Sequence, residues 1–348
     1  MVGTLCVLGI AGNVLSIVVL GRDQTIRRTT AFLLQMLAVA DTIYLVSCLV
    51  VQTLDAVVVW TDWLPTGVRR GWPYVEAYAW PLASVAQTAT VWLVVVLTAD
   101  RYVAICRPLH AAQYSTVARV RTAVAAVWIV AAVYNLPRFF ERVVVVVTPS
   151  QPVKLSSADL EVLLSLLFST PFPGGVMDHA SSSDLPSTTL SPGMIGQAAL
   201  RKTAMRSDST YFLVYKTLLY FVVRFLVPFA ALAFFNQRLI AAMRASNELR
   251  QRSAAGGGGA KERQHTWILV VVVVVFVVCE LPDLTLRASV AIDSHVPGRL
   301  MLTASRVYYA NIFSNLMLTV NSCINFVIYC LMGRRFRLIL VQMIGCGR

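Results

Sequence analysis

Charged residues are scarce in this chain of 348 residues, and acidic residues are the scarcer kind. Only 14% of the residues are charged, with 17 Asp and Glu against 30 Lys and Arg, whereas 57% are hydrophobic. Ordinary soluble domains carry about 25% charged residues. This shortage excludes a disordered protein, a coiled coil and most soluble enzymes. The net charge of +13 would suggest nucleic acid as a partner, so the location of the charge must decide.

Patterns that carry catalysis are also missing. The four histidines have no paired metal-binding spacing, and we find no phosphate-binding glycine loop and no nucleophile–base pair. The last apolar run contains no lysine, which excludes a retinal Schiff base there. We therefore expect that the protein is not an enzyme and that it needs no organic cofactor.

Long apolar runs are what the chain has instead. A membrane helix needs about 20 mostly apolar residues, and an open sheet cannot satisfy its backbone in lipid. The sequence predicts an all-α membrane protein, a seven-transmembrane helix bundle with a short amphipathic helix eight at 334–343. The seven spans are expected at 1–20, 32–59, 74–105, 118–137, 211–243, 266–292 and 302–332.

The basic residues gather on one side of these spans. If the first terminus is outside, the segments around Arg22, Arg107, Arg238 and Arg334 carry the whole net charge of +13, and the outer segments sum to zero. Cytoplasmic loops carry an excess of Lys and Arg. We therefore expect an extracellular N-terminus, a cytoplasmic C-terminus and contact with anionic lipid, and no nucleic acid as a partner.

One domain accounts for residues 1–343, followed by a short tail at 344–348. The long extracellular loop covers 138–210, with a strand at 143–147 that forms half of a hairpin and a surface helix at 160–168. The cytoplasmic loop at 244–263 is short. Every cysteine lies in a span or on the cytoplasmic side, so no extracellular disulfide is available. Cys346 is either a palmitoylation site or an unmodified thiol.

Polar residues within the spans need an explanation because they are costly in lipid. Asp41 lies in the middle of the second span, Thr90 lies in the third, and Asn321 and Asn325 share a face of the seventh. These side chains either converge on a hydrated cavity that holds a cation or form a network that ties the helices together.

Two further clusters lie on the third and sixth spans. Asp100-Arg101-Tyr102 ends the third span, and Glu262 opens the sixth on the same side, where it is a candidate partner for Arg101. Farther along the sixth span, Phe276, Glu280, Asp283 and Arg287 recur at helical spacing around Pro282, which must kink the helix. The two acids either attract a cationic ligand or pair internally with Arg224; the sequence leaves both open.

In this order, the motifs resemble those of class A (rhodopsin-like) G-protein-coupled receptors. They are Gly12-Asn13, Leu37 to Asp41, Asp100-Arg101-Tyr102, Cys106-Arg107-Pro108-Leu109, Trp128, Pro228, Phe276, Pro282 and Asn325-Phe326-Val327-Ile328-Tyr329. Within the class, the chain is similar to invertebrate FMRFamide-receptor-like neuropeptide receptors. Its resemblance there rests on the segments Ala86 to Trp92, Tyr134 to Glu141 and Asn321 to Phe326.

Some positions depart from the pattern of the class. Glu76 stands where a cysteine is expected at the top of helix three, and the loop partner of that cysteine is missing too. Glu280 replaces a tryptophan, Asn236 a tyrosine and Phe326 a proline. Asn13 also lies close to the first residue, so we expect the sequence to be a piece whose first helix lacks its outer turns.

The resemblance implies a receptor in the plasma membrane for an amidated RFamide-type peptide, signalling through heterotrimeric G proteins. The ligand's arginine would approach Glu76, Glu280 or Asp283. Ligand contact is expected at Glu76, Trp80, Gln87, Glu280, Asp283, Tyr308 and Tyr309. The activation switch is expected at Asp100, Arg101, Tyr102, Glu262, Phe276, Pro282, Asn325 and Tyr329.

The resemblance also raises the cation cavity to a candidate sodium site formed by Asp41, Thr90, Asn321 and Asn325. Two other functions stay open. A seven-helix transporter or channel would show inverted repeats or a continuous polar pore, and the sequence shows neither. A peptide-binding receptor that does not couple to a G protein would share every motif.

Overall fold

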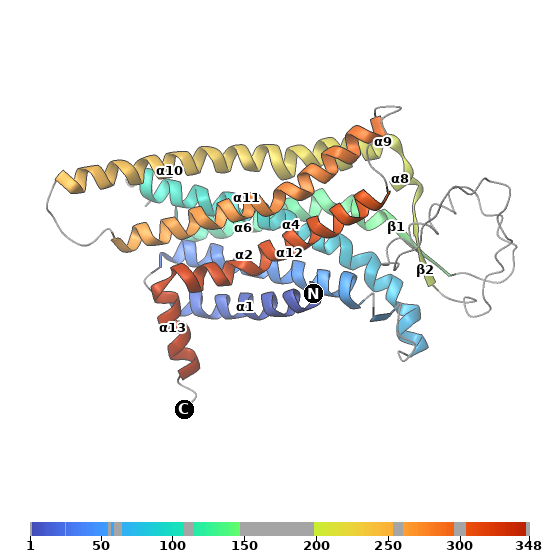
Figure 1. Ribbon diagram of the computed structural model, residues 1–348, viewed down its shortest axis with the longest axis horizontal. Coiled ribbons are helices and arrows are strands. Elements are labelled where there is room, and N and C mark those ends of the chain that lie inside the picture. Colours follow the sequence, from blue (N-terminus) through green and yellow to red (C-terminus); the bar gives the residue numbers. More distant parts are fainter. Residues whose placement is uncertain are drawn as a thin grey trace, which may run out of the picture.

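The computed structural model describes residues 2–24, 26–54, 57–58, 65–107, 115–146, 198–252, 260–295 and 304–345. Its long helices run side by side in one bundle (Figure 1). In lipid a helix satisfies its own backbone, which is why each apolar run folds this way. The bundle consists of α1 (Val2–Arg22), α2 (Arg28–Cys48), α4 (Thr66–Cys106), α6 (Val117–Asn135), α10 (Val227–Arg252), α11 (Ala260–His295) and α12 (Ala304–Met332).

These helices confirm the seven spans expected from the sequence. Among the described residues, six helical segments are long and apolar enough to cross a membrane. The seventh helix, α11, carries the valine run at 270–275 and packs between α10 and α12. Helix α1 packs against both α2 and α12, so the first and last helices of the bundle meet.

A glycine makes one of these helix contacts possible. At Gly12 of α1, an added Cβ would lie only 3.0 Å from the Cβ of Phe326 in α12. A Cβ at this position would require Phe326 to shift by a few tenths of an ångström, so glycine permits this close approach. Phe326, which replaces a proline in the expected motif, packs in turn on Phe336 with ring centroids 5.9 Å apart.

Several helix ends are wound differently from the regular α-helices that the sequence predicts. Helix α2 continues as a π-helix, η1 (Leu49–Leu54), and α6 continues as a 3-10 helix, η2 (Leu136–Phe140). A short helix, α9 (Ser209–Tyr211), and two π-helical segments, η4 (Phe212–Leu219) and η5 (Val222–Leu226), precede α10. Single π-turns are rare and occur frequently at functional sites, and η5 contains the buried Arg224.

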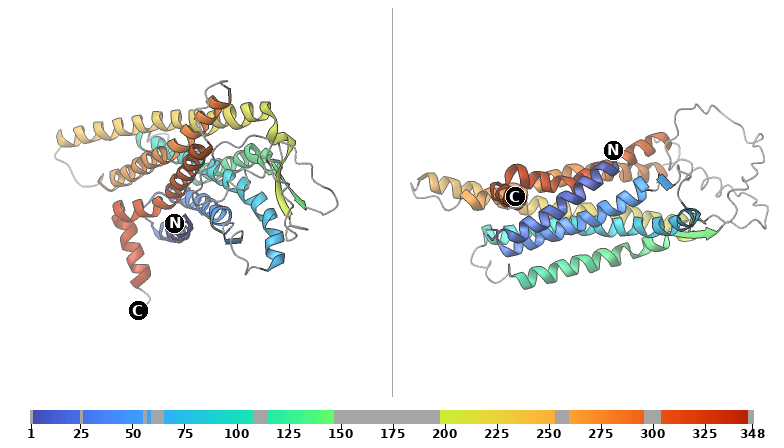
Figure 2. Two further views of the ribbon diagram at one scale, coloured as in Figure 1. Left: turned by 45° about the vertical axis from the view of Figure 1, so that its right-hand side comes forward. Right: turned by 90° about the horizontal axis from the view of Figure 1, so that it is seen from below.

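The two ends of the bundle carry different structures (Figures 1 and 2). At one end, called the hairpin end below, β1 (Arg142–Val146) pairs antiparallel with β2 (Ala198–Lys202), which confirms the strand expected at 143–147. At the opposite end, called the α13 end, α13 (Arg334–Gly345) turns away from the bundle, which confirms helix eight. The helix expected at 160–168 and the candidate lipidation site Cys346 lie outside the described residues.

A buried carboxylate fixes the hairpin to the bundle. Glu141, which precedes β1, is 5% exposed. It accepts hydrogen bonds from Lys216 of η4 at 2.8 Å, from the Tyr211 hydroxyl at 2.8 Å and from Arg206 of the short helix α8 (Ala204–Ser207) at 3.1 Å. Burial acts to raise the pKa of Glu141, but the positive charge of Lys216, these hydrogen bonds and the charge of Arg206 outweigh it. Its pKa therefore lies below the ordinary value of 4.5.

We expect Glu141→Gln to lower the free energy of unfolding by about 2 kcal/mol, because two cations lose their acceptor. A lowered pKa means that the stabilisation is fully present above pH 4.5 and is lost as the pH falls through the lowered pKa. Thermal unfolding of the wild-type protein should therefore shift more with acid than that of Glu141→Gln. Parallel pH profiles for wild type and Glu141→Gln would contradict the assignment.

Candidate functional site

A buried ion pair joins helices within the bundle below the hairpin end. Arg224 of η5 and Glu280 of α11 are each 1% exposed, and an Arg224 Nη atom lies 3.3 Å from a Glu280 carboxylate oxygen. Arg224 also donates to Gln87 Oε1 of α4 at 2.8 Å. One guanidinium therefore connects three helices, and the pairing of Glu280 with Arg224 is the internal alternative that the sequence left open.

Asp283, the acid on the other side of Pro282 from Glu280, also has hydrogen-bond partners within the bundle. Asp283 follows Pro282, which lies inside α11, and is 3% exposed. Its carboxylate accepts from Arg287 Nε at 2.8 Å, from the Tyr220 hydroxyl at 2.5 Å and from Ser314 Oγ at 3.3 Å. Glu280 and Asp283, on either side of the proline, are thus both paired with basic side chains of the bundle itself.

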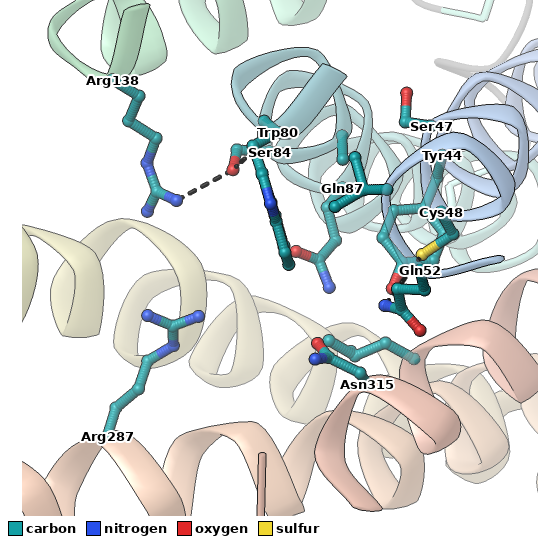
Figure 3. A pocket seen from close by; sticks show the side chains of 13 residues that line it. Tyr44, Ser47, Cys48, Gln52, Trp80, Ser84, Gln87, Arg138, Arg287 and Asn315 are labelled. Atoms are coloured by element: carbon teal, nitrogen blue, oxygen red, sulfur yellow. Dashed lines mark hydrogen bonds between the residues drawn. The ribbon is translucent and has the colours of Figure 1, made fainter. Parts of the chain in front are cut away.

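A cavity of about 60 Å³ opens next to these pairs. Helices from around the bundle line it, and Figure 3 shows the side chains converging from separate helices. Its polar lining comprises Tyr44, Ser47, Cys48, Gln52, Trp80, Ser84, Gln87, Arg138, Arg287 and Asn315. The volume suits a few water molecules or one small functional group rather than a whole peptide.

Besides Glu280 and Asp283, the structure places the expected ligand residues in three different situations. Trp80 and Gln87 line the cavity. Glu76 forms a salt bridge with Arg142 of β1 at 3.0 Å, and this pair is about one-quarter exposed. Tyr308 and Tyr309 pack on each other with ring centroids 5.5 Å apart and are not part of the cavity lining.

The expected switch residues at the α13 end form a closed network. Arg101 pairs with Asp100 at 2.6 Å, and Asp100 also accepts from Thr29 and Ser115. Tyr102 packs on Phe235 with ring centroids 5.4 Å apart. Glu262 belongs to α11, but its side chain lies outside the described residues, so its pairing with Arg101 stays a prediction.

The remaining switch residues lie inside the bundle. Phe276, 2% exposed, meets Phe229 edge-on with ring centroids 6.1 Å apart. Tyr329, 4% exposed, packs on Phe336 at 5.7 Å. These contacts place both rings between helices, Phe276 against α10 and Tyr329 against α13.

The candidate sodium site is built around a fully buried carboxylate. Asp41 is 0% exposed; it accepts from Thr90 at 3.2 Å and from Asn325 Nδ2 at 2.9 Å. It forms no salt bridge with any basic side chain of the described residues. Asn321 is buried but makes no hydrogen bond to Asp41 in the described structure. Oxygen ligands suit a hard cation, so Asp41 and Thr90 fit one.

Some residues around the cavity and the buried ion pairs were not among the site residues expected from the sequence. Arg138, Tyr220 and Ser314 complete the cavity and its ion pairs, yet each is the kind of side chain that occurs at many helix ends and in many cores. Only Arg224 carried a signal, because a basic residue in an apolar run needs a partner. The partner of Arg224 depends on which side of η5 is turned toward α11. The π-helical winding of η5 determines this direction.

Comparison with known proteins identifies the class. The sequence profile of the 7 transmembrane receptor (rhodopsin family) matches residues 12–155 and 202–329, most of the chain. The chain belongs to this family. It is therefore a multi-pass membrane protein and a signalling receptor rather than an enzyme, which agrees with the bundle and with the ordered motifs.

Individual relatives narrow the resemblance. The FMRFamide receptor of Drosophila melanogaster is 26% identical over 331 residues, which is 95% of this chain and 50% of that protein. The FMRFamide peptide receptor frpr-18 of Caenorhabditis elegans is 28% identical over 341 residues, covering 97% of this chain and 67% of that protein. The Drosophila Trissin receptor is 33% identical over 37% of the chain. The chain thus spans about half the length of the Drosophila FMRFamide receptor.

Removing one partner of the Arg224–Glu280 pair should destabilise the protein more than replacing both partners with apolar residues. We expect Arg224→Met or Glu280→Leu alone to lower the free energy of unfolding by about 3–5 kcal/mol, because each leaves an uncompensated buried charge. The double variant should regain more than half of that loss. Glu76→Gln breaks a partly exposed pair and should cost about 1 kcal/mol or less. Thermal unfolding of the purified variants measures all four; additive losses in the double variant would contradict the pairing.

Proposed function

We propose that the protein is a plasma-membrane receptor for an extracellular amidated peptide of the RFamide type and that it signals through heterotrimeric G proteins. The single observation that supports this most is the likeness to two FMRFamide receptors along nearly the whole chain. A cavity near the hairpin end and the paired Asp100–Arg101 at the α13 end also support the proposal, since they offer a ligand contact and a candidate switch at different depths of the bundle.

The orientation follows from charge. Arg119, Arg121, Arg238 and the arginines of α13 gather toward the α13 end, so the positive-inside rule makes this end cytoplasmic and the hairpin end extracellular. In this arrangement, outward movement of α11 about Pro282 would open the bundle beside Arg101. The helix of a G-protein α subunit would then enter the opening as a helix in a groove.

Recognition of the ligand's arginine would proceed by exchange, because the acids are already paired. Of the four side chains in the two ion pairs, Arg287 is the most accessible, with 41% of its side chain exposed. Its partner Asp283 is 5% exposed. A ligand guanidinium that displaces Arg287 from Asp283 would keep the carboxylate neutralised while altering α11 next to Pro282. Trp80 and Gln87 would contact the same part of the ligand.

The test uses FMRFamide on cells that display the chain on their surface. We expect nucleotide exchange on a heterotrimeric G protein and, by reciprocal coupling, a loss of peptide affinity when guanine nucleotide is added. Asp283→Asn should weaken the peptide response at least about tenfold, whereas Asp208→Asn, at an exposed carboxylate outside the cavity, should not.

The outcomes separate the candidate functions. Binding of FMRFamide without nucleotide exchange would support a receptor that does not couple. Peptide-independent transport of an ion or solute would support a transporter or channel. If no RFamide-type peptide binds or evokes a response on cells with confirmed surface expression, the proposed ligand class is wrong.

We further propose that sodium binds at Asp41 and favours the resting receptor, held by the oxygens of Asp41 and Thr90. Sodium chloride should raise the thermal unfolding midpoint of the purified protein above that in choline chloride of equal ionic strength. Asp41→Asn should abolish this difference. Asn321→Ala should retain it, because Asn321 makes no hydrogen bond to Asp41 in the described structure. An equal midpoint in both salts for the wild type would overturn the sodium site.

A further inference from the structure

Three arginines surround a single aromatic ring beside the cavity. The guanidinium carbons of Arg287, Arg224 and Arg138 lie 4.2, 5.2 and 5.7 Å from the centre of the Tyr220 ring. Tyr220 is 2% exposed and Arg224 is 1% exposed, so on the buried side of the ring the dielectric constant is low and like charges repel strongly. The face of the ring offsets part of this repulsion.

The acids of the cluster do not balance the three cations. Glu280 pairs with Arg224 and Asp283 pairs with Arg287. Arg138 of η2 forms no salt bridge with any described residue; it donates to Ser84 Oγ at 2.8 Å, and its Nε has no hydrogen-bond acceptor in the described structure. The cluster therefore carries one formal positive charge in excess, on Arg138.

The excess charge faces the cavity. Arg138 and Arg287 both line it, and Figure 3 shows their guanidinium groups directed toward each other from opposite walls. Gln87 contributes an Nε2 that is buried without an acceptor in the described structure, while its Oε1 accepts a hydrogen bond from Arg224. No carboxylate is part of the lining. The cavity thus offers hydrogen-bond donors and positive charge, which is the complement of an anion.

We infer that this cavity is a carboxylate subsite, in which Arg138 is the principal contact and Gln87 and Arg287 are supporting donors. Guanidinium groups bind carboxylates through paired, charge-assisted hydrogen bonds, and the volume of about 60 Å³ admits a group of this size. The inference rests on the proposed function only in taking the carboxylate to belong to the ligand. Because an amidated peptide has no C-terminal carboxylate, this group would come from an acidic side chain of the natural peptide, which FMRFamide itself lacks. Exchange of Arg287 for a ligand arginine would leave Arg287 free and would strengthen the subsite.

Acetate tests the subsite without any peptide. In thermal unfolding of the purified chain, acetate should raise the midpoint more than acetamide, its neutral isostere, and more than chloride at the same ionic strength. Arg138→Gln should raise the acetate concentration needed for the same shift by about tenfold. Arg121→Gln is the matched control, because Arg121 lies 5.7 Å over the Phe32 ring near the other end of α6; it should respond as the wild type does.

Either of two results overturns the subsite: acetate no more effective than acetamide or chloride on the wild type, or an unchanged acetate response in Arg138→Gln. The first comparison needs no variant, so it decides even if Arg138→Gln does not fold. Arg138→Lys provides a second variant, which keeps the charge but loses the paired donors and should respond between the wild type and Arg138→Gln.

Four peptides identify the source of the carboxylate. FMRFamide is compared with its free-acid form, and FMRFamide extended by an N-terminal aspartate is compared with the asparagine extension. Arg138→Gln should weaken binding by about tenfold only for the peptide whose carboxylate occupies the subsite. Equal losses for all four would show that the ligand's carboxylate does not enter it, which overturns the inference. If no peptide binds the wild type, the proposed function is wrong. The acetate experiment then still decides whether the cavity binds a carboxylate.

Discussion

A charge inside a helix bundle has no bulk water to solvate it, so each ionisable group there needs a partner. This constraint organises the interior of the protein. Arg224 of η5 is held by Glu280 and Gln87, and Asp283 is held by Arg287, Tyr220 and Ser314. Since the partners lie on different helices, satisfying the charges also fixes how η5, α11 and α12 are rotated relative to one another.

The position of these pairs relative to Pro282 links binding to movement. Glu280 and Asp283 lie on the two sides of the residue at which α11 is least able to hold its own backbone hydrogen bonds. A ligand that alters either pair therefore acts where little force is needed to change the direction of the helix. The π-helical turns of η5 on the facing side add a second place at which the backbone is already irregular.

Much of this architecture could be predicted from the sequence, because lipid leaves a long apolar run little choice but a helix. The seven spans were predicted in this way, whereas helix eight was predicted from its amphipathic pattern and β1 from the valine-rich segment at 143–147. The sequence could not show that Glu280 turns to Arg224 rather than to the cavity, because that depends on the winding of η5. Nor could it show that Arg138 joins the same cluster, since its position depends on how η2 ends the fourth helix.

The contact between Glu76 and Arg142 has a consequence of its own. It joins α4 to β1 at the position where the class pattern has a cysteine, and the six cysteines that the structure describes are all free. A salt bridge of this kind, about one-quarter exposed, opens and closes without a redox reaction and is weakened by added salt. The salt bridge therefore joins β1 to α4 reversibly, and in the proposed orientation the ionic strength of the extracellular medium, rather than its oxidants, sets the strength of this one contact.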